Sequence, residues 1–467
     1  MPALDPNLYP TACEALALMR TGTLKAAHLM EAALDAIGRH NPRVNAIVHL
    51  ESSSALLDAA HEADKRRAAG QSLGPLDGLP LTVKDNLWVR GWPATWGSAT
   101  LRDFRPDTDD AAVACLRQAG AVLVGKTNVP EFALAAITDN AVYGPTRHPF
   151  DAALTPGGSS GGAAASVALG MTPFALATDA GGSIRRPAAY TGTVGFKPSR
   201  VTVLASNGFP STSLDFQVIG PIARSVADCA LLAATIAAPG MDGQRLRELG
   251  QDPRGRLDAL AGQSRLDVLM LRPAPLQEAA ITAELEAVAA RLSASGHRVR
   301  WGDAPYELAA VEAVWSALIA IGVHGAVTKL GLDTALLSPP MRALAERGAA
   351  MPATVFYEAM RTLVELRAAS NLIWESADML VSPASPSFTW AFDAPFPARI
   401  AGAEAGPRSA AVYATFANAV GAPSISLPVP GRSAGEGIGV QLTMKPGADV
   451  RLLALAQELE GVLDLKR

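Results

Sequence analysis

Two segments rich in glycine and serine constrain the fold of this chain most, because each must pass through a tight turn. They are residues 155–162 (TPGGSSGG) and residues 178–187 (TDAGGSIRRP), and Ser183 follows Ser159 by 24 residues. Consecutive glycines permit backbone conformations closed to other residues and bring N–H groups close to a bound group. The small residues at 160–169 predict a buried helix between the two turns.

Hydrophobic periodicity predicts alternating helices and strands along the rest of the chain. Helices are predicted at 24–38, 53–69, 111–118, 277–293 and 448–463, and strands at 79–84, 121–124, 174–177, 267–271 and 379–382. Asn41-Pro42 is interpreted as the stop of the first helix. This alternation predicts a layered α/β fold. Residues 240–265 are interpreted as an exposed connection, and residues 300–378 as a mostly helical cover over the sheet.

Composition excludes several classes of function. The 467 residues are 49% hydrophobic and 18% charged, which is typical of a globular protein with a large core. The net charge of −4 gives no electrostatic reason to expect binding to nucleic acid or to an anionic membrane. The sequence has no uninterrupted apolar stretch of membrane-spanning length, and its first ten residues do not resemble a signal peptide. We therefore expect a cytoplasmic protein.

Cysteine and histidine supply no metal or disulfide pattern. Cys13, Cys115 and Cys229 are far apart and form no CxxC pair, so we expect small buried thiols in a reducing compartment. The seven histidines are scattered without an HExxH motif. No metal site and no organic cofactor are expected.

The serine turns and a lysine together predict a hydrolase centre. A serine hydroxyl becomes a nucleophile when a base takes its proton, and a buried lysine with a lowered pKa is such a base. Lys84 ends the apolar run at 79–84. Each feature alone has another interpretation: Ser183 as a helix-capping serine, Ser159 and Ser160 as part of a linker or phosphate loop, and Lys84 as a lysine that reaches solvent. The phosphate-loop pattern GxxxxGK[ST] is absent, which weakens that alternative.

Taken in order, these motifs resemble the amidase signature family of serine hydrolases. The resemblance runs from about residue 24 to residue 236. It rests on residues 78–86, 124–132, 144–146, 155–162, 178–187, 195–198 and 220–225, with weaker matches at 382–383 and 421–423. It implies a large mixed β-sheet covered by helices on both faces, in a single domain over 1–467 with its catalytic core at about 60–236.

The resemblance also implies a role for each site residue. Ser183 matches the nucleophile, Ser159 the bridging serine after a cis peptide bond, and Lys84 the general base, with Ser160 in support. Asp179 and Arg185 match positions that hold the glycine turn. The predicted oxyanion hole consists of the amides of Ala180, Gly181, Gly182 and Ser183. In this mechanism Lys84 takes a proton through Ser159 from Ser183, which attacks an amide carbonyl, and water then cleaves the acyl-enzyme.

The family contains stand-alone amidases and the glutaminase component of the tRNA-dependent amidotransferase. That component usually carries Gly and Ser after its Glu-Phe dipeptide, whereas this chain reads ALAAITDN after Glu131-Phe132. We therefore favour a stand-alone amidase that acts on a small-molecule amide, with a homodimer as one possible assembly. A non-catalytic binding subunit is the third hypothesis, and the intact Lys84, Ser159 and Ser183 argue against it.

Specificity is harder to predict. Arg186 replaces an uncharged residue of many relatives and is a candidate for binding a substrate carboxylate, although we favour an ion pair with another protein group. The loops at 130–145, 203–217 and 300–410 are expected to shape the pocket. Five aromatic residues could line an acyl pocket, although most are expected in the core: Trp96, Tyr143, Tyr190, Phe209 and Trp315.

Overall fold

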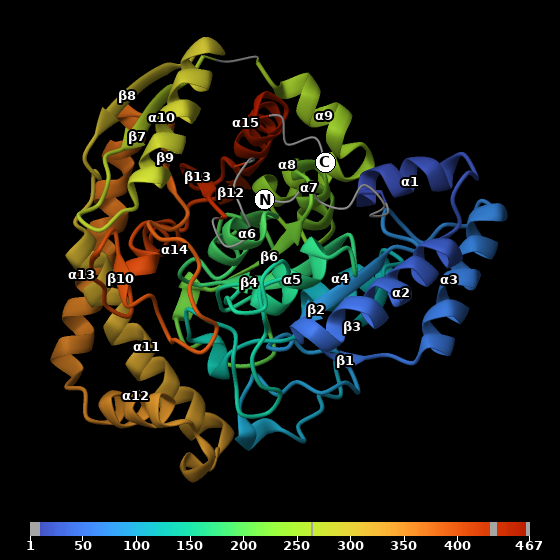
Figure 1. Cartoon of the computed structure of the whole chain (residues 1–467), viewed down its shortest axis with the longest axis horizontal. Helices are drawn as coiled ribbons and strands as arrows, with labels where there is room; N and C mark the ends of the chain where they lie inside the picture. Colours follow the sequence, from blue (N-terminus) through green and yellow to red (C-terminus); the bar gives the residue numbers. More distant parts are fainter. Residues whose placement is uncertain (1–9, 263–264, 430–436, 464–467) are drawn as a thin grey trace.

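One mixed sheet organises the molecule (Figure 1). The structure is a computed structural model that describes residues 10–262, 265–429 and 437–463. Its 11-stranded sheet has the order β1-β3-β2-β4-β6-β5-β12-β13-β9-β7-β8. The strands are β1 Ile47–Leu50, β2 Pro80–Lys84, β3 Val122–Thr127, β4 Phe174–Asp179, β5 Val194–Lys197, β6 Val218–Ala223, β7 Asp267–Leu271, β8 Arg298–Gly302, β9 Met379–Pro383, β12 Ser424–Pro428 and β13 Gly439–Met444. A separate pair is formed by β10 (Arg399–Ile400) and β11 (Ala403–Glu404).

Helices cover both faces of this sheet, as predicted. They are α1 Ala12–Arg20, α2 Ala26–Val44, α3 Ser53–Ala68, α4 Ala111–Gln118, α5 Gly161–Ala168, α6 Arg185–Thr191, α7 Val226–Thr235, α8 Met241–Glu248, α9 Pro253–Leu260, α10 Ala279–Ala294, α11 Leu308–Leu330, α12 Pro339–Ala349, α13 Ala353–Ser376, α14 Thr415–Ala419 and α15 Asp449–Val462. The mixed character is also confirmed: β2 runs parallel to β3 and β4, whereas β4 and β6 are antiparallel. Because both halves of the chain supply strands, a single domain stays our prediction.

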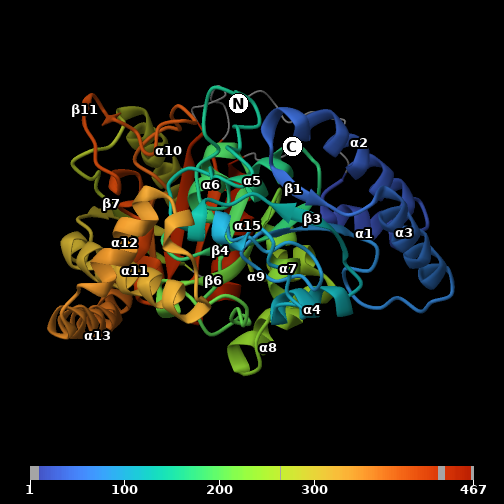
Figure 2. The same cartoon turned by 90° about the horizontal axis from the view of Figure 1, so that it is seen from below.

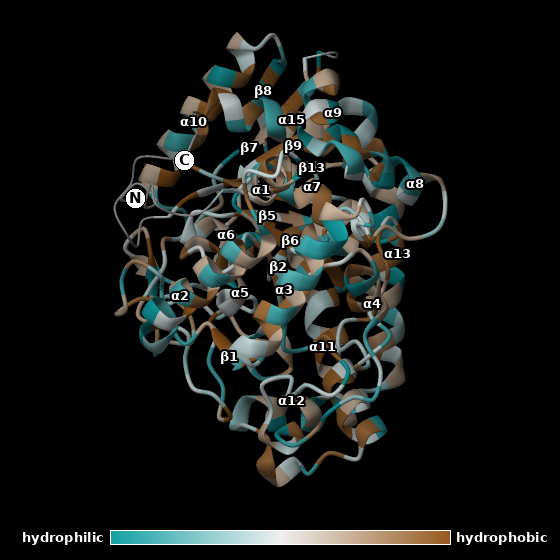
Figure 3. Cartoon of the chain, turned by 90° about the vertical axis from the view of Figure 1, so that its right-hand side faces the viewer, coloured by the Kyte–Doolittle hydropathy of each residue, from teal (hydrophilic) through white to brown (hydrophobic). Residues whose placement is uncertain are grey.

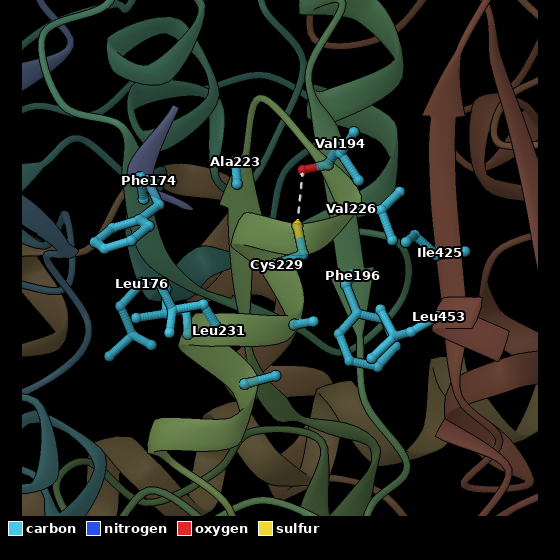
Figure 4. Close-up of a cluster of buried hydrophobic side chains, with 14 of the residues drawn as sticks. Phe174, Leu176, Val194, Phe196, Ala223, Val226, Cys229, Leu231, Ile425 and Leu453 are labelled. Atoms are coloured by element: carbon cyan, nitrogen blue, oxygen red, sulfur yellow. Dashed lines mark hydrogen bonds between the residues drawn. The ribbon is translucent and has the colours of Figure 1, made fainter. Parts of the chain in front are cut away.

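The centre of the sheet shows why its two faces differ. Phe174 and Leu176 of β4 join the large core cluster under α7, which also contains Phe196 and Cys229 (Figure 4). The alternate residues Ala175 and Ala177 pack with alanines of α5 on the opposite face. Alternation places successive side chains on opposite faces of a strand. Small residues on both partners let α5 approach the sheet closely, and this fixes the turn that precedes it.

The outer helices are amphipathic. Figure 3 shows hydrophilic and hydrophobic residues alternating along α10. Ile281, Leu285, Val288 and Leu292 are buried at helical spacing, while their neighbours face outward. This spacing aligns an apolar stripe on the side that packs against the sheet.

The predicted helical cover at 300–378 is formed by α11, α12 and α13, at the opposite end of the molecule from α2 and α3 (Figures 1 and 2). Contrary to the composition analysis, α11 is long and apolar enough to cross a membrane, and it alone among the described helices meets that test. Half of its apolar window is buried inside the protein. Because α11 also packs against α12 and α13, its composition fits a core helix.

Two local predictions are wrong. Residues 240–265 are not only a connection, since α8 and α9 lie there with Leu246 and Leu257 fully buried. The first long helix passes through Pro42 and ends at Asn45, whose backbone is left-handed with φ 51°. The Asn41 side chain accepts bonds from the amides of Ala46 and Ile47, so the helix ends three residues later than proline alone suggests.

Candidate active site

The predicted general base lies where parallel strands end. Lys84 is the last residue of β2, and Asp179 is the last residue of the neighbouring parallel strand β4. The carboxyl ends of parallel strands lie at the same edge of a sheet, which is where ligands bind in open α/β folds. The turn before α5 brings Ser159 and Ser160 to the same place, and the Gly158–Ser159 peptide bond is cis.

Lys84 is fully buried among hydroxyl groups. Its Nζ lies 2.8 Å from the Oγ of both Ser159 and Ser160, and 3.1 Å from Thr178 Oγ1. Burial lowers the pKa of Lys84 to about 7, and the opposing charge of Asp179 limits the shift. A neutral amine is therefore well populated near neutral pH, as a proton acceptor requires.

The hydrogen bonds distinguish the two serines. Ser160 Oγ donates to the carbonyl of Thr178 at 3.2 Å, so its oxygen receives a hydrogen bond from Lys84. Within the described residues, the hydroxyl of Ser159 has no hydrogen-bond partner other than Lys84. Ser159 is thus the serine whose proton can pass to Lys84, while Ser160 orients the amine.

Two other fully buried lysines do not contact these serines. Lys126 Nζ donates to backbone carbonyls, including that of Leu87 at 2.7 Å. Lys197 Nζ donates to the carbonyl of Pro198 at 2.8 Å, and burial lowers its pKa to about 7, with the charge of Arg185 contributing. Burial alone therefore does not identify the base; contact with the serines does.

A buried ion pair holds the second glycine turn, as predicted. Arg185 Nη2 and Asp179 Oδ1 lie 2.9 Å apart, and both side chains are inaccessible to solvent. The Asp179 carboxylate also accepts from the amides of Gly182 and Ile184 at 2.8 and 3.0 Å. Burial acts to raise the pKa of Asp179, but the charge of Arg185 and these hydrogen bonds outweigh it and hold the pKa well below its usual range.

The backbone of this turn bears on the predicted oxyanion hole. The amide of Gly182 already donates to Asp179. No described residue accepts a hydrogen bond from the amides of Ala180, Gly181 or Ser183, which leaves these three available to a developing negative charge. Gly182 has φ 99°, and a Cβ there would lie 2.6 Å from the Cβ of Ala414, so a larger residue would displace the turn.

The site opens at its predicted nucleophile. From residue 174 to residue 199, every residue is buried except Ala180 and Ser183, which are partly exposed. Within the described chain, the Ser183 hydroxyl makes no hydrogen bond, so the structure does not join it directly to Ser159. The two turns are linked by the amide of Ser160, which donates to the carbonyl of Ser183 at 3.2 Å. Hydrogen bonds between catalytic groups are often long without substrate and shorten when substrate binds.

Arg186 lies beside these turns and is only 4% exposed. Its Nη2 donates to the carbonyl of Gly158 at 3.2 Å, and its Nε is buried without a hydrogen-bond partner. In the portion of the chain that the structure describes, no carboxylate lies within ion-pair distance of Arg186. The ion pair expected from the sequence is therefore not seen there.

Several residues at the site were not predicted. Thr178 contacts Lys84 through both its hydroxyl and its carbonyl, although sequence analysis placed it only within a motif. Asn418 and Gln441 accept hydrogen bonds from Arg185 at 2.6 and 2.8 Å, and local sequence carries no signal for partners so distant in the chain. Of the aromatic candidates, Trp96, Tyr190 and Phe209 are buried and Tyr143 and Trp315 are partly buried. Among the described residues, no group of three His, Cys, Asp or Glu side chains could hold a metal ion.

The buried ion pair makes a stability prediction. Asp179→Asn is expected to lower the free energy of unfolding by about 3–5 kcal/mol, because Arg185 is left charged, buried and without its carboxylate. Denaturant unfolding at pH 7 measures the change. Because folding depresses the pKa of Asp179, its contribution is present above pH about 4 and is lost as the pH falls.

An exposed pair is the matched control. Asp35 and Arg39 lie 2.8 Å apart, with 67% and 61% of their side chains exposed. Asp35→Asn is expected to change the free energy of unfolding by about 0–1 kcal/mol. Equal losses in the two variants would contradict a special role for the Asp179–Arg185 pair.

The fold and site define the class: an α/β protein with a buried lysine–serine pair behind a partly exposed serine. Comparison with known families is more specific. The family model described as "Amidase" matches residues 28–453, so the chain belongs to the amidase family.

Solved structures of this family match almost the whole chain. A 6-aminohexanoate cyclic dimer hydrolase superposes with a TM-score of 0.85 and 26% identity, over 99% of this chain and 98% of that one. A bacterial aryl acylamidase of the amidase signature family gives 0.85 and 25%, over 99% of both chains. A peptide amidase from Stenotrophomonas maltophilia gives 0.81 and 26%, over 99% and 98% respectively.

Curated relatives match over a shorter region, and they are components of glutamyl-tRNA(Gln) amidotransferases, in each case the one designated A. The component from Salinispora tropica is 46% identical over 231 residues, or 48% of this chain and 46% of that protein. The component from Acidothermus cellulolyticus is 43% identical over 244 residues, or 52% and 46%. The alignment thus spans about half the length of the curated relatives.

Proposed function

We propose that the chain hydrolyses the C–N bond of a carboxylic acid amide through an acyl-enzyme on Ser183. The observation that carries this proposal is the 2.8 Å contact between Lys84 Nζ and Ser159 Oγ in a buried centre, where the pKa of Lys84 is about 7. Membership of the amidase family supports it.

In the first half of the proposed reaction, neutral Lys84 takes the proton of Ser159, and Ser159 takes that of Ser183 as Ser183 Oγ attacks the carbonyl carbon. The amides of Ala180, Gly181 and Ser183 donate to the oxyanion, and Asp179 keeps the turn in place through Gly182. Ser159 then returns a proton to the departing nitrogen, and the C–N bond breaks. Water, deprotonated through the same relay, attacks the ester and releases the acid.

Two interpretations of this chemistry remain. The similarity to amidotransferase components over 231 residues favours a glutaminase that works with partner subunits. Similarity over nearly the full length to hydrolases such as the aryl acylamidase favours a stand-alone amidase, which is our first choice. We also carry forward a cytoplasmic location, a homodimer and the absence of nucleic-acid binding as predictions.

Activity of the purified chain alone distinguishes these interpretations. We expect release of ammonia or amine from aliphatic, aromatic or carboxylate-bearing amides without added subunits, because the whole relay lies within this chain. Glutamine belongs in the same panel. Turnover of glutamine alone, or turnover only after partner subunits are added, would assign the chain to the amidotransferase. Reaction of Ser183 with a fluorophosphonate separates both enzymes from a binding subunit, which would not be labelled.

A further inference from the structure

An aromatic side chain borders the opening of the site. Trp315 of α11 lies against the predicted oxyanion turn, since a Cβ on Gly181 would be 3.1–3.4 Å from three atoms of its ring. Ala180, one of the two partly exposed residues of this region, packs in the same apolar cluster as Trp315. A substrate that reaches Ser183 therefore passes beside the indole.

Arg408 lies over the face of that indole. Its guanidinium carbon is 4.7 Å from the centroid of the Trp315 ring. Its Nε donates to both oxygens of Glu312 at 3.1 and 3.2 Å, and its Nη2 donates to Thr415 Oγ1 at 2.7 Å. Nη1 makes no hydrogen bond with the described part of the chain, and 31% of the side chain is accessible. Arg408 is thus held in position with one donor group unused.

The charges around this opening do not balance. Asp179 is paired with Arg185, and Glu312 with Arg408. Arg186 has no carboxylate within ion-pair distance among the described residues. Burial lowers the pKa of Arg186 to about 10, which leaves it charged at neutral pH, and the charge of Arg408 contributes to the lowering. With Lys84 neutral, one positive charge is left, and a ligand with one negative charge would compensate it.

We propose that Arg408 and Trp315 determine specificity by binding a substrate that carries a carboxylate in addition to its scissile amide. The carboxylate accepts from Arg408 Nη1, and the chain or ring that joins it to the amide lies along Trp315. This inference rests on the proposed amide hydrolysis and names its substrate class as anionic amides.

Arg408 fits this role better than Arg186. The Arg186 guanidinium is buried and already donates to Gly158, the residue before Ser159. Its charge contributes to the field, but a substrate carboxylate would have to displace that contact. Arg408 is accessible, and the Nε that it shares between two Glu312 oxygens leaves its outer edge free for a second acceptor.

Binding to the Ser183→Ala protein tests the inference without requiring turnover. The probes are two matched pairs: glutaramate with pentanamide, and 4-carbamoylbenzoate with 4-methylbenzamide. Calorimetry is expected to show tighter binding of at least one acidic probe by roughly 10- to 100-fold, the range of a hydrogen bond to a charged group. Adding Arg408→Gln is expected to remove this preference and leave the neutral partner unchanged. Adding Glu312→Gln is expected to strengthen acidic binding, because a competing negative charge is removed.

The control is Arg361→Gln, which removes an arginine that also pairs with glutamates but lies exposed on α13. It should leave the preference intact. Equal binding within both pairs, equal weakening of both members by Arg408→Gln, or a preference lost only in Arg186→Gln would overturn the inference. Turnover of any amide by the unmodified chain is a separate readout, so failure of the proposed hydrolysis is distinguishable from failure of this specificity.

Discussion

Ser183→Ala is expected to lower kcat for amide hydrolysis by about 10⁴-fold or more, with little change in the fold. The hydroxyl that forms the acyl-enzyme is removed, and a hydrogen-bonded relay loses its function as a unit when one member is lost. The Ser183 hydroxyl makes no hydrogen bond with a described residue, so its removal leaves no buried group unsatisfied. Steady-state ammonia release and near-UV circular dichroism measure the two effects.

Two further serine variants make this result specific. Ser54→Ala, at an exposed position of α3, is expected to leave kcat unchanged. Ser160→Ala is expected to cost less activity than Ser159→Ala, because Ser160 Oγ orients Lys84 whereas Ser159 carries the proton. Retention of kcat within tenfold in Ser183→Ala would exclude Ser183 as the nucleophile.

The site could be predicted from sequence where local segments carry its chemistry. Lys84, Ser159 and Ser183 each lie in a motif, and the structure brings Lys84 and Ser159 into contact. The Asp179–Arg185 pair was predictable for the same reason, because both residues lie within one ten-residue turn. The mixed sheet and its covered faces came from resemblance together with strand and helix periodicity.

Contacts between distant segments were not predictable. Asn418 and Gln441 satisfy Arg185 from 233 and 256 residues away, and no local pattern marks them. Trp315 had no special signal among the aromatic residues until α11 placed it over Gly181. The misjudged α8 and α9 have a related cause: their charged residues resemble a loop, and burial of Leu246 and Leu257 depends on neighbours that sequence does not identify.

The value of kcat/KM is expected to rise with pH through an inflection near 7 and then reach a plateau. Protonated Lys84 cannot accept a proton from Ser159, and burial lowers its pKa to about 7. At pH 5 the neutral fraction, and with it kcat/KM, is about 100-fold below the plateau, because each pH unit below the pKa lowers that fraction tenfold. In Lys84→Met, kcat/KM is expected to fall by about 10³-fold or more and to lose this inflection.

Lys197 provides the decisive comparison, because burial lowers its pKa to about 7 as well. Its Nζ donates to the carbonyl of Pro198 and contacts neither serine. Lys197→Met is therefore expected to keep the inflection near 7, even where it lowers stability, while Lys84→Met loses it. If the inflection instead followed Lys197, the titration would report the conformation of the turn around Arg185. If both variants kept it, the base would be a group other than these lysines, and the relay through Ser159 would have to be abandoned.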